Sequence, residues 1–463
     1  MNHLLPATEE NPLASGAIGR LIAKFAIPVI IGGLISAAYN IVDQIFIGQS
    51  VGLLGNAATN VAFPLVTLSN SLALLFGVGS ASNFSLELGN KRKDNAVQIY
   101  GNGISLLIIC GVLLFAVVLT FLKPLLIAFG ATEQVLPYTL TYTGITAFGI
   151  PFSMISIGGG HLIRADGSPT YAMIATASGA ILNCFLDPLF IFVFDLGIAG
   201  AAYATITGQI ISALLVLYYY QKKFKTAKLE SKHFLPSIHR IKIIASLGAA
   251  SCFNQLAMSI VQITLNNTLK NYGAKSIYGS DIPLACVGVI SKVNVLFMAF
   301  VLGIAQGCQP IFGFNYGAQN YSRVRETYKK AATAVSTICM ISFFCFQIFP
   351  RQIVSIFGTG SELYFEFAEK YFRIYLLFTF INGIQPLTSN FFTSIGKAKM
   401  GIVMSLTRQI IFLLPLILIL PTFFGIDGVM YAGPIADAAA VILAGCFAWR
   451  EMKKMCIAET EQA

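Results

Sequence analysis

The sequence predicts an all-α polytopic membrane protein whose twelve transmembrane helices form two six-helix bundles. Three observations predict it: the composition, a series of apolar stretches and an internal repeat. Of the 463 residues, 56% are hydrophobic and only 11% are charged, and one soluble core cannot bury that much apolar surface. Each apolar stretch has about 20 residues or more, which is the length that a helix needs to cross a bilayer.

The apolar stretches divide evenly around a polar, basic segment at residues 221–242. The expected organisation is an N-terminal tail (1–20), an N-terminal bundle (21–220), a linker (221–242), a C-terminal bundle (243–450) and a C-terminal tail (451–463). The N-terminal tail carries no cleavable signal pattern, so the first helix is expected to act as the insertion signal. The expected spans are residues 21–48, 56–86, 96–122, 135–159, 170–194, 197–220, 243–269, 282–314, 327–349, 371–392, 400–424 and 425–449.

The net charge of +10 comes from basic residues that gather in the loops of one side. They lie in the loop at Lys91, Arg92 and Lys93, in the linker and in both tails, whereas the opposite side carries few. Cytoplasmic loops of membrane proteins are enriched in Lys and Arg. We therefore expect both termini and the linker to be cytoplasmic in a multi-pass protein of a cell membrane, most simply a bacterial cytoplasmic membrane. The basic excess indicates topology and not a nucleic-acid partner.

The two halves repeat each other at a constant shift of 228 residues. This shift pairs Gly197 with Gly425, Gly200 with Gly428, Tyr203 with Tyr431, Gly79 with Gly307, Gly89 with Gly317 and Tyr100 with Tyr328. Each half carries an even number of spans, so both enter the membrane in the same sense. The halves should be related by an axis along the membrane normal, with a cavity between them. Such a duplication is typical of alternating-access transporters, although a channel or a membrane enzyme is not excluded.

The first apolar stretch contains a carboxylate. Residues 25–42 carry no charge, Asp43 follows, and Ile45, Phe46 and Ile47 continue the apolar pattern. A carboxylate inside hydrocarbon costs roughly 3 kcal/mol or more, so it normally faces a partner or a wet cavity. The alternative is that the helix ends near Tyr39 and that Asp43 lies in water.

Several functional classes find no support in the sequence. The nine cysteines form no C-x-x-C pair and the four histidines are scattered, so neither a disulfide framework nor a metal cluster is indicated. No phosphate-binding G-x-x-x-x-G-K-[ST] loop occurs, and the soluble segments are too short for an ATPase domain. We expect no enzymatic activity and no cofactor, and energy from an ion gradient or from a separate subunit.

Several motifs together resemble the multidrug and toxic compound extrusion (MATE) family. They are the first-helix pattern IP…YNIVDQIFIG with Pro28 and Asp43, the G-N-K-R-K loop after the second helix, and RADGSPTYAM…ILNCFLDPLF at residues 164–190. With the plan of two six-helix halves, the similarity extends from residue 21 to residue 449. The resemblance implies a secondary antiporter that exports amphipathic, often cationic compounds in exchange for H⁺ or Na⁺.

The N-terminal pattern is similar to the branch of this family whose ion site lies in the first half. For that branch, the resemblance assigns cation binding to positions that here are Asp43, Asn183, Asp187 and Thr205, with Tyr142 in the neighbouring hydrogen-bond network. Another branch uses acidic residues in helices seven and ten. Here those helices offer only amides, so a second site is not expected; the amides are Asn254, Gln255, Asn382 and Gln385.

A count of helical rise, which is independent of the resemblance, places the same residues at one depth. Asp43 and Asp187 lie about 10–12 Å from the outer ends of their helices, with Tyr142 and Thr205 at a similar depth. Asn183 and Asp187 are four residues apart and so share a helical face. These oxygen ligands suit Na⁺ or a shared proton. The alternative for Asp187 is a structural carboxylate bonded to Asn183 and Tyr142.

Further intramembrane residues have two interpretations each. Lys292, Arg408 and Asp437 are expected to form structural pairs; the alternative is a role in gating or in binding an anionic group. Large, adaptable apolar side chains suit a drug cavity, with ordinary packing as the alternative. The residues expected to line such a cavity are Phe63, Met258, Phe297 and Met298.

These observations predict a cation-coupled multidrug exporter that works by alternating access. We expect it to act as a monomer on xenobiotics, antibiotics included, and to bind small amphipathic molecules and no nucleic acid. A flippase for a lipid-linked precursor is the alternative within transport, and it would favour a basic cavity open to lipid. A membrane-embedded enzyme or receptor is the alternative of another class. No nucleophile–base set and no ligand-binding domain supports it.

Overall fold

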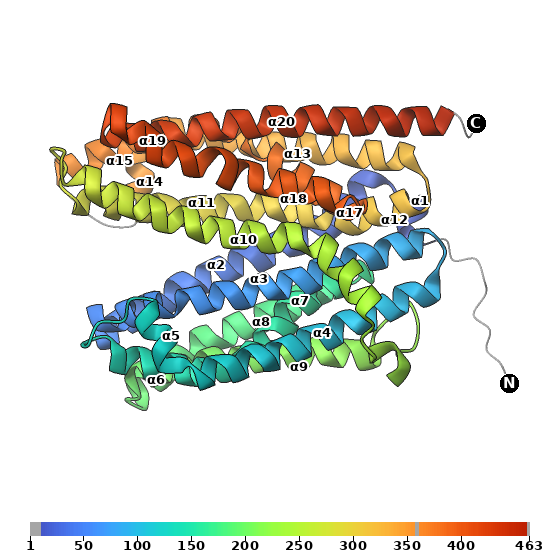
Figure 1. Ribbon diagram of the computed structural model, residues 1–463, viewed down its shortest axis with the longest axis horizontal. Helices are drawn as coiled ribbons and strands as arrows, with labels where there is room; N and C mark the ends of the chain where they lie inside the picture. The colour runs from blue at the N-terminus through green and yellow to red at the C-terminus, as the bar shows by residue number, and fades with distance from the viewer. Residues whose placement is uncertain (1–10, 357–360, 461–463) are drawn as a thin grey trace.

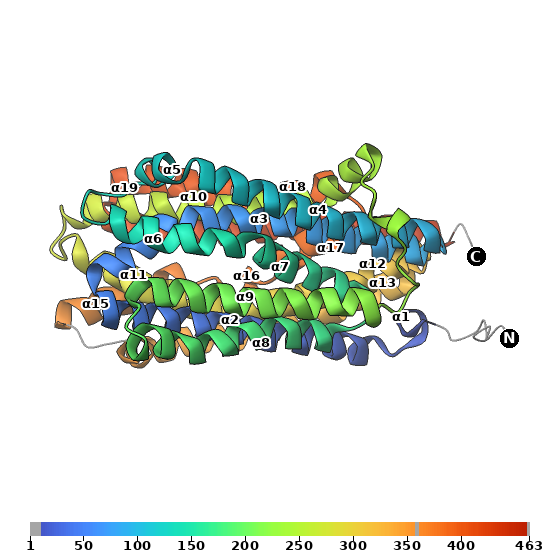
Figure 2. The same ribbon diagram turned by 90° about the horizontal axis from the view of Figure 1, so that it is seen from below.

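The computed structural model describes residues 11–356 and 361–460, and over these ranges it contains helices and turns but no β-strand. The long helices run side by side along one direction (Figures 1 and 2). In chain order the elements are α1 (Pro12–Ser15), α2 (Ile18–Val51), α3 (Leu53–Gly89), α4 (Lys93–Thr120), α5 (Leu122–Ala128), α6 (Leu136–Thr146), η1 (Ala147–Gly149), α7 (Ile150–Ala165), α8 (Pro169–Pro188), η2 (Leu189–Val193), α9 (Gly197–Lys222), η3 (Ser231–Phe234), α10 (Ile238–Gly273), α11 (Asp281–Gly307), α12 (Gln309–Gly317), α13 (Tyr321–Ile348), α14 (Pro350–Ser355), α15 (Glu362–Tyr375), α16 (Thr379–Asn382), α17 (Ile384–Ser394), α18 (Ala398–Leu406), η4 (Thr407–Leu413), α19 (Leu414–Phe424) and α20 (Ile426–Thr460).

Within the described residues, eleven uninterrupted helical stretches are long and apolar enough to cross a membrane. The twelfth expected span, residues 371–392, is instead divided among α15, α16 and α17, with turns at residues 376–378 and at Gly383. At Gly383 the interruption has a local cause, because Pro386 lacks the N–H that would bond one turn back across that residue. In Figure 2, α15, α16 and α17 follow one another along the bundle, so the chain still crosses it here.

Two halves are visible, one built from α2–α9 and one from α10–α20 (Figure 1). Each has its own buried core, with Phe84 and Tyr100 in the N-terminal half and Phe312 and Phe391 in the C-terminal half. The beginning of α2, including Phe25, packs into the second core. The beginning of α10, including Ile244, packs in turn into the first core. The two predicted bundles therefore have separate cores, which α2 and α10 join.

The sequence repeat corresponds to a repeat in backbone geometry. Gly197 is the first residue of α9 and Gly425 directly precedes α20, and both have a positive φ, of +54° and +59°. A residue with a side chain rarely adopts this conformation, which explains glycine at both positions. A π-helical stretch also lies in the fifth helix of each half, η2 in one and η4 in the other. The predicted duplication is thus confirmed in its local detail.

The halves meet closely at the end of the bundle that carries α1 and the end of α20, which we call the α1 end. There α3 packs against α12 so closely that a Cβ atom at Gly89 would lie 2.1 Å from the Phe314 carbonyl oxygen. The repeat-related Gly317 would place a Cβ atom 2.2 Å from the Leu86 carbonyl oxygen. Towards the opposite end, which carries α5 and α15 and which we call the α15 end, the halves diverge (Figure 1).

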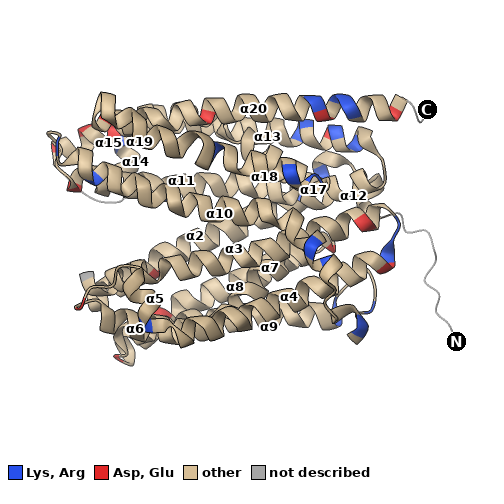
Figure 3. Ribbon diagram, in the orientation of Figure 1, with Lys and Arg blue, Asp and Glu red and all other residues tan. Residues whose placement is uncertain are grey.

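The linker and the first and last described residues also lie at the α1 end (Figure 1). Helix α9 continues to Lys222, and α10 begins at Ile238. Asp166, in the turn between α7 and α8, anchors the linker by accepting hydrogen bonds from the Tyr219 hydroxyl, the Lys225 N–H and the Thr226 hydroxyl at 2.7, 2.8 and 2.6 Å. Lys and Arg are concentrated at this end (Figure 3). Met1 and Ala463, for which a cytoplasmic position is predicted, lie outside the described residues.

Candidate functional site

A cavity of about 570 Å³ lies between the two halves. Its wall comes mainly from α2, α3, α6, α7 and α9, and α10 and α11 of the C-terminal half contribute Gln255, Lys292 and Val295. Its α2 residues, from Ala37 to Gln44, lie in the part of α2 nearer the α15 end. The volume falls in the range of about 300–1,000 Å³ that small-molecule sites occupy.

The lining combines hydrogen-bonding groups with apolar patches. Asp43 and Lys292 are its two charged residues. The apolar part includes Phe63, Val66 and Ile150. Uncharged polar residues are more numerous in the lining than apolar ones. They are Tyr39, Asn40, Gln44, Thr59, Ser69, Asn70, Tyr142, Thr143, Thr146, Ser153, Thr205, Gln209 and Gln255. Such a lining suits an amphipathic ligand.

Two carboxylates adjoin on the N-terminal side of this cavity: Asp43 lines it, and Asp187 lies behind Asp43, outside the lining. Asp43 on α2 and Asp187 on α8 lie within hydrogen-bonding reach of each other. Asn183, one turn before Asp187, donates from Nδ2 to Asp187 Oδ1 at 3.2 Å. In the described part of the chain no Lys, Arg or His forms an ion pair with either carboxylate. The structure therefore brings together the two acidic residues that the sequence placed at one depth.

The local sequence explains how Asp187 is presented. The α-helical part of α8 ends at Pro188, and the π-helical stretch η2 follows at once. Proline lacks the N–H that would continue the helical ladder, and single π-helical turns are frequent at functional sites. Asp187 is fully buried at this break, so its carboxylate faces α2 and not the surrounding lipid.

Several buried oxygens at this wall accept no hydrogen bond within the described residues. They are Asp43 Oδ1, Asn183 Oδ1, Asp187 Oδ2 and Gln209 Oε1. Buried polar atoms are normally paired, so four acceptors without donors at one place require an explanation. A proton or a hard cation such as Na⁺ would satisfy these oxygens, because both bind to oxygen. No group of three or more His, Cys, Asp or Glu side chains that could hold a metal ion occurs among the described residues.

Tyr142 and Thr205 complete the predicted set. They line the cavity from α6 and α9, and the Tyr142 hydroxyl lies within hydrogen-bonding reach of the Thr205 hydroxyl. Among the described residues Tyr142 forms no hydrogen bond to Asp187, which the structural alternative for Asp187 includes. This leaves Asn183 as the neighbour that hydrogen-bonds Asp187.

Two further residues belong to the site but are absent from the predicted set. Tyr39 lies one turn before Asp43 and is close to both carboxylates. Gln209 lies one turn after Thr205 and also lines the cavity. Both follow from the i, i+4 spacing that places side chains on one helical face. The same spacing, applied to Asp43 and Thr205 in the sequence, would have found them.

Only one of the four apolar residues predicted for the drug cavity lines it. Phe63 does, with 55% of its surface exposed. Met258 lines a separate pocket of about 90 Å³ within the C-terminal half. Phe297 is 5% exposed and packs edge-to-face on Phe346, and Met298 packs against the same core. Composition does not distinguish these positions, because all four are large apolar residues on membrane helices.

Of the three other intramembrane charged residues named from the sequence, two form an ion pair and one does not. Arg408 in η4 donates from Nε to Asp437 on α20, which confirms the expected structural pair for these two. Lys292 has no ion pair with any described residue and lines the cavity instead. The expectation of a structural pair is therefore wrong for Lys292, because α11 turns this residue towards the cavity and not towards Asp437.

Comparisons with known proteins agree with this architecture. A family model described as MatE matches residues 28–189 and 250–419. Over 428 residues the chain is 24% identical to the "Multidrug export protein MepA" of Staphylococcus haemolyticus (strain JCSC1435), covering 92% of each chain. Over 430 residues it is 25% identical to the protein of the same name from Staphylococcus aureus (strain MSSA476), again covering 92% of each.

Solved structures share the fold. One, described as the "Outward-facing conformation of a multidrug resistance MATE family transporter of the MOP superfamily", superposes with a TM-score of 0.90 at 23% identity, covering 97% of this chain and 99% of that one. A transporter from Pyrococcus furiosus Vc1 (DSM3638), described with a binding pocket of reverse polarity, superposes with a TM-score of 0.89 at 23% identity and the same coverage. Because the family model matches most of its length, the chain belongs to the MatE family, the multidrug and toxic compound extrusion transporters.

Proposed function

We propose that this protein is a secondary active exporter of amphipathic, often cationic compounds, driven by H⁺ or Na⁺ that binds between Asp43 and Asp187. The observation that carries the proposal is the adjoining carboxylate pair, which no described basic residue neutralises and of which Asp43 lines a cavity between two pseudo-symmetric halves. The multidrug export named for the MepA relatives supports the substrate class.

The proposed coupling follows from the cost of two adjoining charges. Carboxylates close together in a low-dielectric environment repel each other, and a proton or a cation between them removes that repulsion. With the ion bound, α2, α8 and α9 can pack closely. Without it, hydration of the carboxylates favours a wetter, more open arrangement. The ion and the exported compound thus bias one two-state bundle in opposite directions.

The proposed orientation places the α1 end in the cytoplasm. The concentration of Lys and Arg at that end supports it through the positive-inside rule (Figure 3). The halves are in contact at this end and diverge towards the α15 end (Figure 1), so we expect the cavity in this conformation to open to the outside. A cation then enters the cavity from the outside at the α15 end. The exported compound leaves through the same opening, in the opposite direction.

The test uses the purified protein in vesicles with separately imposed Na⁺ and pH gradients. Export of a fluorescent cationic dye should require at least one inwardly directed gradient, and it should stop when Asp43 is replaced by Asn. Dye export by the wild type without any gradient, or at an unchanged rate in Asp43→Asn, would contradict the proposal. Thr207→Ala is a matched control, because Thr207 lies on α9 outside the cavity lining and its hydroxyl donates to the Tyr203 carbonyl.

A further inference from the structure

The charges of the cavity lining are divided between its two walls. Asp43, with Asp187 behind it, belongs to the N-terminal half, and Lys292 belongs to the C-terminal half. The remaining lining residues carry no formal charge at neutral pH. A ligand between the walls therefore meets a negative group on one side and a positive group on the other.

Lys292 lies on a face of α11 that points away from the protein core. Ala285, Gly288, Lys292 and Val295 recur at helical spacing and are all exposed, whereas Val287 and Ile290 between them are buried. A Cβ atom at Gly288 would meet no heavy atom within 4 Å, so the space beside Lys292 is open. The ammonium group consequently has room to reach a ligand in the cavity.

Helices α2 and α11 place Lys292 opposite the carboxylates. The two helices pack closely at Gly33, where a Cβ atom would lie 3.4 Å from the Ala299 side chain. Beyond this contact Asp43 lies ten residues along α2, about 15 Å at the usual helical rise. Lys292 lies seven residues along α11 in the same direction, about 10 Å. The two charged residues thus flank the space in which the helices diverge.

The unpaired state of Lys292 contrasts with Arg408, the other basic residue in the interior of the C-terminal half. Arg408 is neutralised by Asp437 on a neighbouring helix. Lys292 forms neither an ion pair nor a hydrogen bond through its side chain with the described residues. A cation on a membrane helix is costly unless water or a counter-ion meets it, and such residues commonly mark substrate paths.

We infer that Lys292 is an anion-binding group on the C-terminal wall and determines specificity for amphipathic compounds that carry a carboxylate or a similar anionic group. A zwitterionic compound would place its cationic part towards Asp43 and Asp187 and its anionic part on Lys292. Gln255, on α10 at the same wall, adds a neutral hydrogen-bond donor. This inference rests on the proposed export function and assigns the substrate class of the same cavity.

The test compares two dyes that differ in a single group. One is a rhodamine with a free carboxylate, which is zwitterionic, and the other is its ethyl ester, which is only cationic. In vesicles, Lys292→Gln should lower the ratio of kcat/KM for the acid to that for the ester by about tenfold, the loss of one charge-assisted hydrogen bond. Lys292→Arg keeps the charge and should retain the wild-type ratio to within about threefold, because the guanidinium also binds carboxylates.

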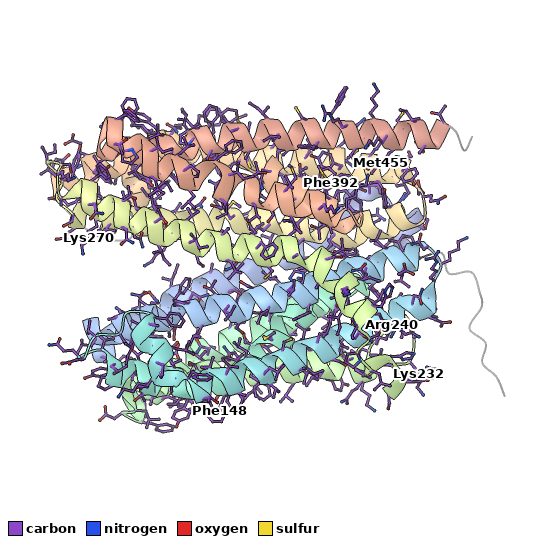
Figure 4. The ribbon with its side chains drawn as sticks, viewed as in Figure 1. Phe148, Lys232, Arg240, Lys270, Phe392 and Met455 are labelled. Carbon is purple, nitrogen blue, oxygen red and sulfur yellow. The ribbon has the colours of Figure 1, made fainter. Side chains whose placement is uncertain are left out.

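The matched control is Lys270→Gln. Lys270 lies near the end of α10, as Figure 4 shows, and it is exposed outside the cavity lining. The substitution removes the same charge from the same half, and it should leave the ratio unchanged. A fall of the ratio in this variant would show that net charge, and not contact with the ligand, sets the preference.

Two further outcomes separate this inference from the proposed function. If Lys292→Gln lowers kcat/KM for both dyes equally, Lys292 acts in closure of the halves and the inference is overturned. If the wild type exports neither dye, the export proposal fails, and equilibrium binding by fluorescence polarisation in detergent then decides the inference. There the acid should bind about tenfold more weakly to Lys292→Gln than to the wild type; equal affinities would overturn it.

Discussion

The two halves of this protein have the same backbone plan, but among the described residues the intramembrane carboxylates have a basic partner in only one half. In the N-terminal half, Asp43 and Asp187 adjoin without a basic partner beside a cavity. In the C-terminal half, Arg408 and Asp437 neutralise each other, with side-chain exposures of 16% and 4%. Asp437 is the repeat counterpart of Gln209, which lines the cavity in the first half, since the same shift of 228 residues relates them.

This difference shows that duplication preserved helix packing but not site chemistry. Each half has a π-helical stretch in its fifth helix, and a charged residue lies at or beside both, Asp187 before η2 and Arg408 within η4. One stretch carries an unneutralised acid and the other carries a base with a buried counter-ion. Only the first arrangement is stabilised by binding a cation, because the two charges of an ion pair already neutralise each other.

The largest expected effect is the loss of coupling in the first half. Asp43→Asn should reduce gradient-driven dye export about 100-fold, that is by about 2.7 kcal/mol in activation free energy. The protein should still insert into the membrane and bind dye, because Asp187 and the rest of the cavity lining remain. Asp187→Asn should behave alike, and the double variant should be little worse than either, because the pair acts as a unit. Initial rates in vesicles measure this; additive losses would contradict a shared ion.

The next effect concerns the ion pair of the second half. Arg408→Met should lower the free energy of unfolding by about 3–5 kcal/mol, because it leaves Asp437 buried without a partner. Adding Asp437→Leu should recover most of that loss. The measurement is thermal unfolding of the purified protein in detergent.

The ion dependence of export provides the complementary check on this pair. Asp437→Asn should impair folding or gating and leave the Na⁺ and H⁺ dependence of the remaining export as in the wild type. If the variant folds as well as the wild type and yet loses ion coupling, the ion site lies wholly or partly in the second half.

A smaller effect tests the equivalence of the halves where they touch. Gly89→Ala and Gly317→Ala should each destabilise the contact between α3 and α12 by about 1–3 kcal/mol, because the new Cβ atom overlaps a carbonyl oxygen. The two losses should agree, since the two glycines make repeat-related contacts. Unfolding in detergent measures them. Gly445→Ala on α20 is the control, because a Cβ atom there meets no neighbour within 4 Å. If Gly445→Ala lowers the free energy of unfolding by the same amount, the clash is not the cause of the loss.

The smallest effect distinguishes the two coupling ions. Thr205→Ala removes a neutral oxygen ligand and should raise the half-saturating Na⁺ concentration about threefold, as expected for the loss of one uncharged interaction. The dependence on a pH gradient should change less, because a proton needs only the carboxylates. Export rates at varied Na⁺ and at varied pH give both values. Equal weakening of the two dependences would place Thr205 in the hydrogen-bond network and not in the ion's ligand set.

The sequence by itself determined the all-helical membrane fold, the repeat and the common depth of the two carboxylates. Hydropathy, helical rise and the constant shift between halves are properties of short stretches or of pairs related by simple arithmetic. Asn183 and Asp187 share a face wherever the helix lies, and Asp43 and Asp187 reach one depth because both helices cross the same layer. These predictions needed no knowledge of which helices are neighbours.

Only the tertiary structure decided which side chains face the cavity. Lys292 and Arg408 are both basic residues on apolar helices, but Arg408 lies beside Asp437 on α20 and Lys292 lies where α2 and α11 diverge. Phe63 and Phe297 differ in the same way, one lining the cavity and one packed on Phe346. The physical reason is that a residue's surroundings depend on how distant segments pack around its helix, and the local pattern does not contain that packing.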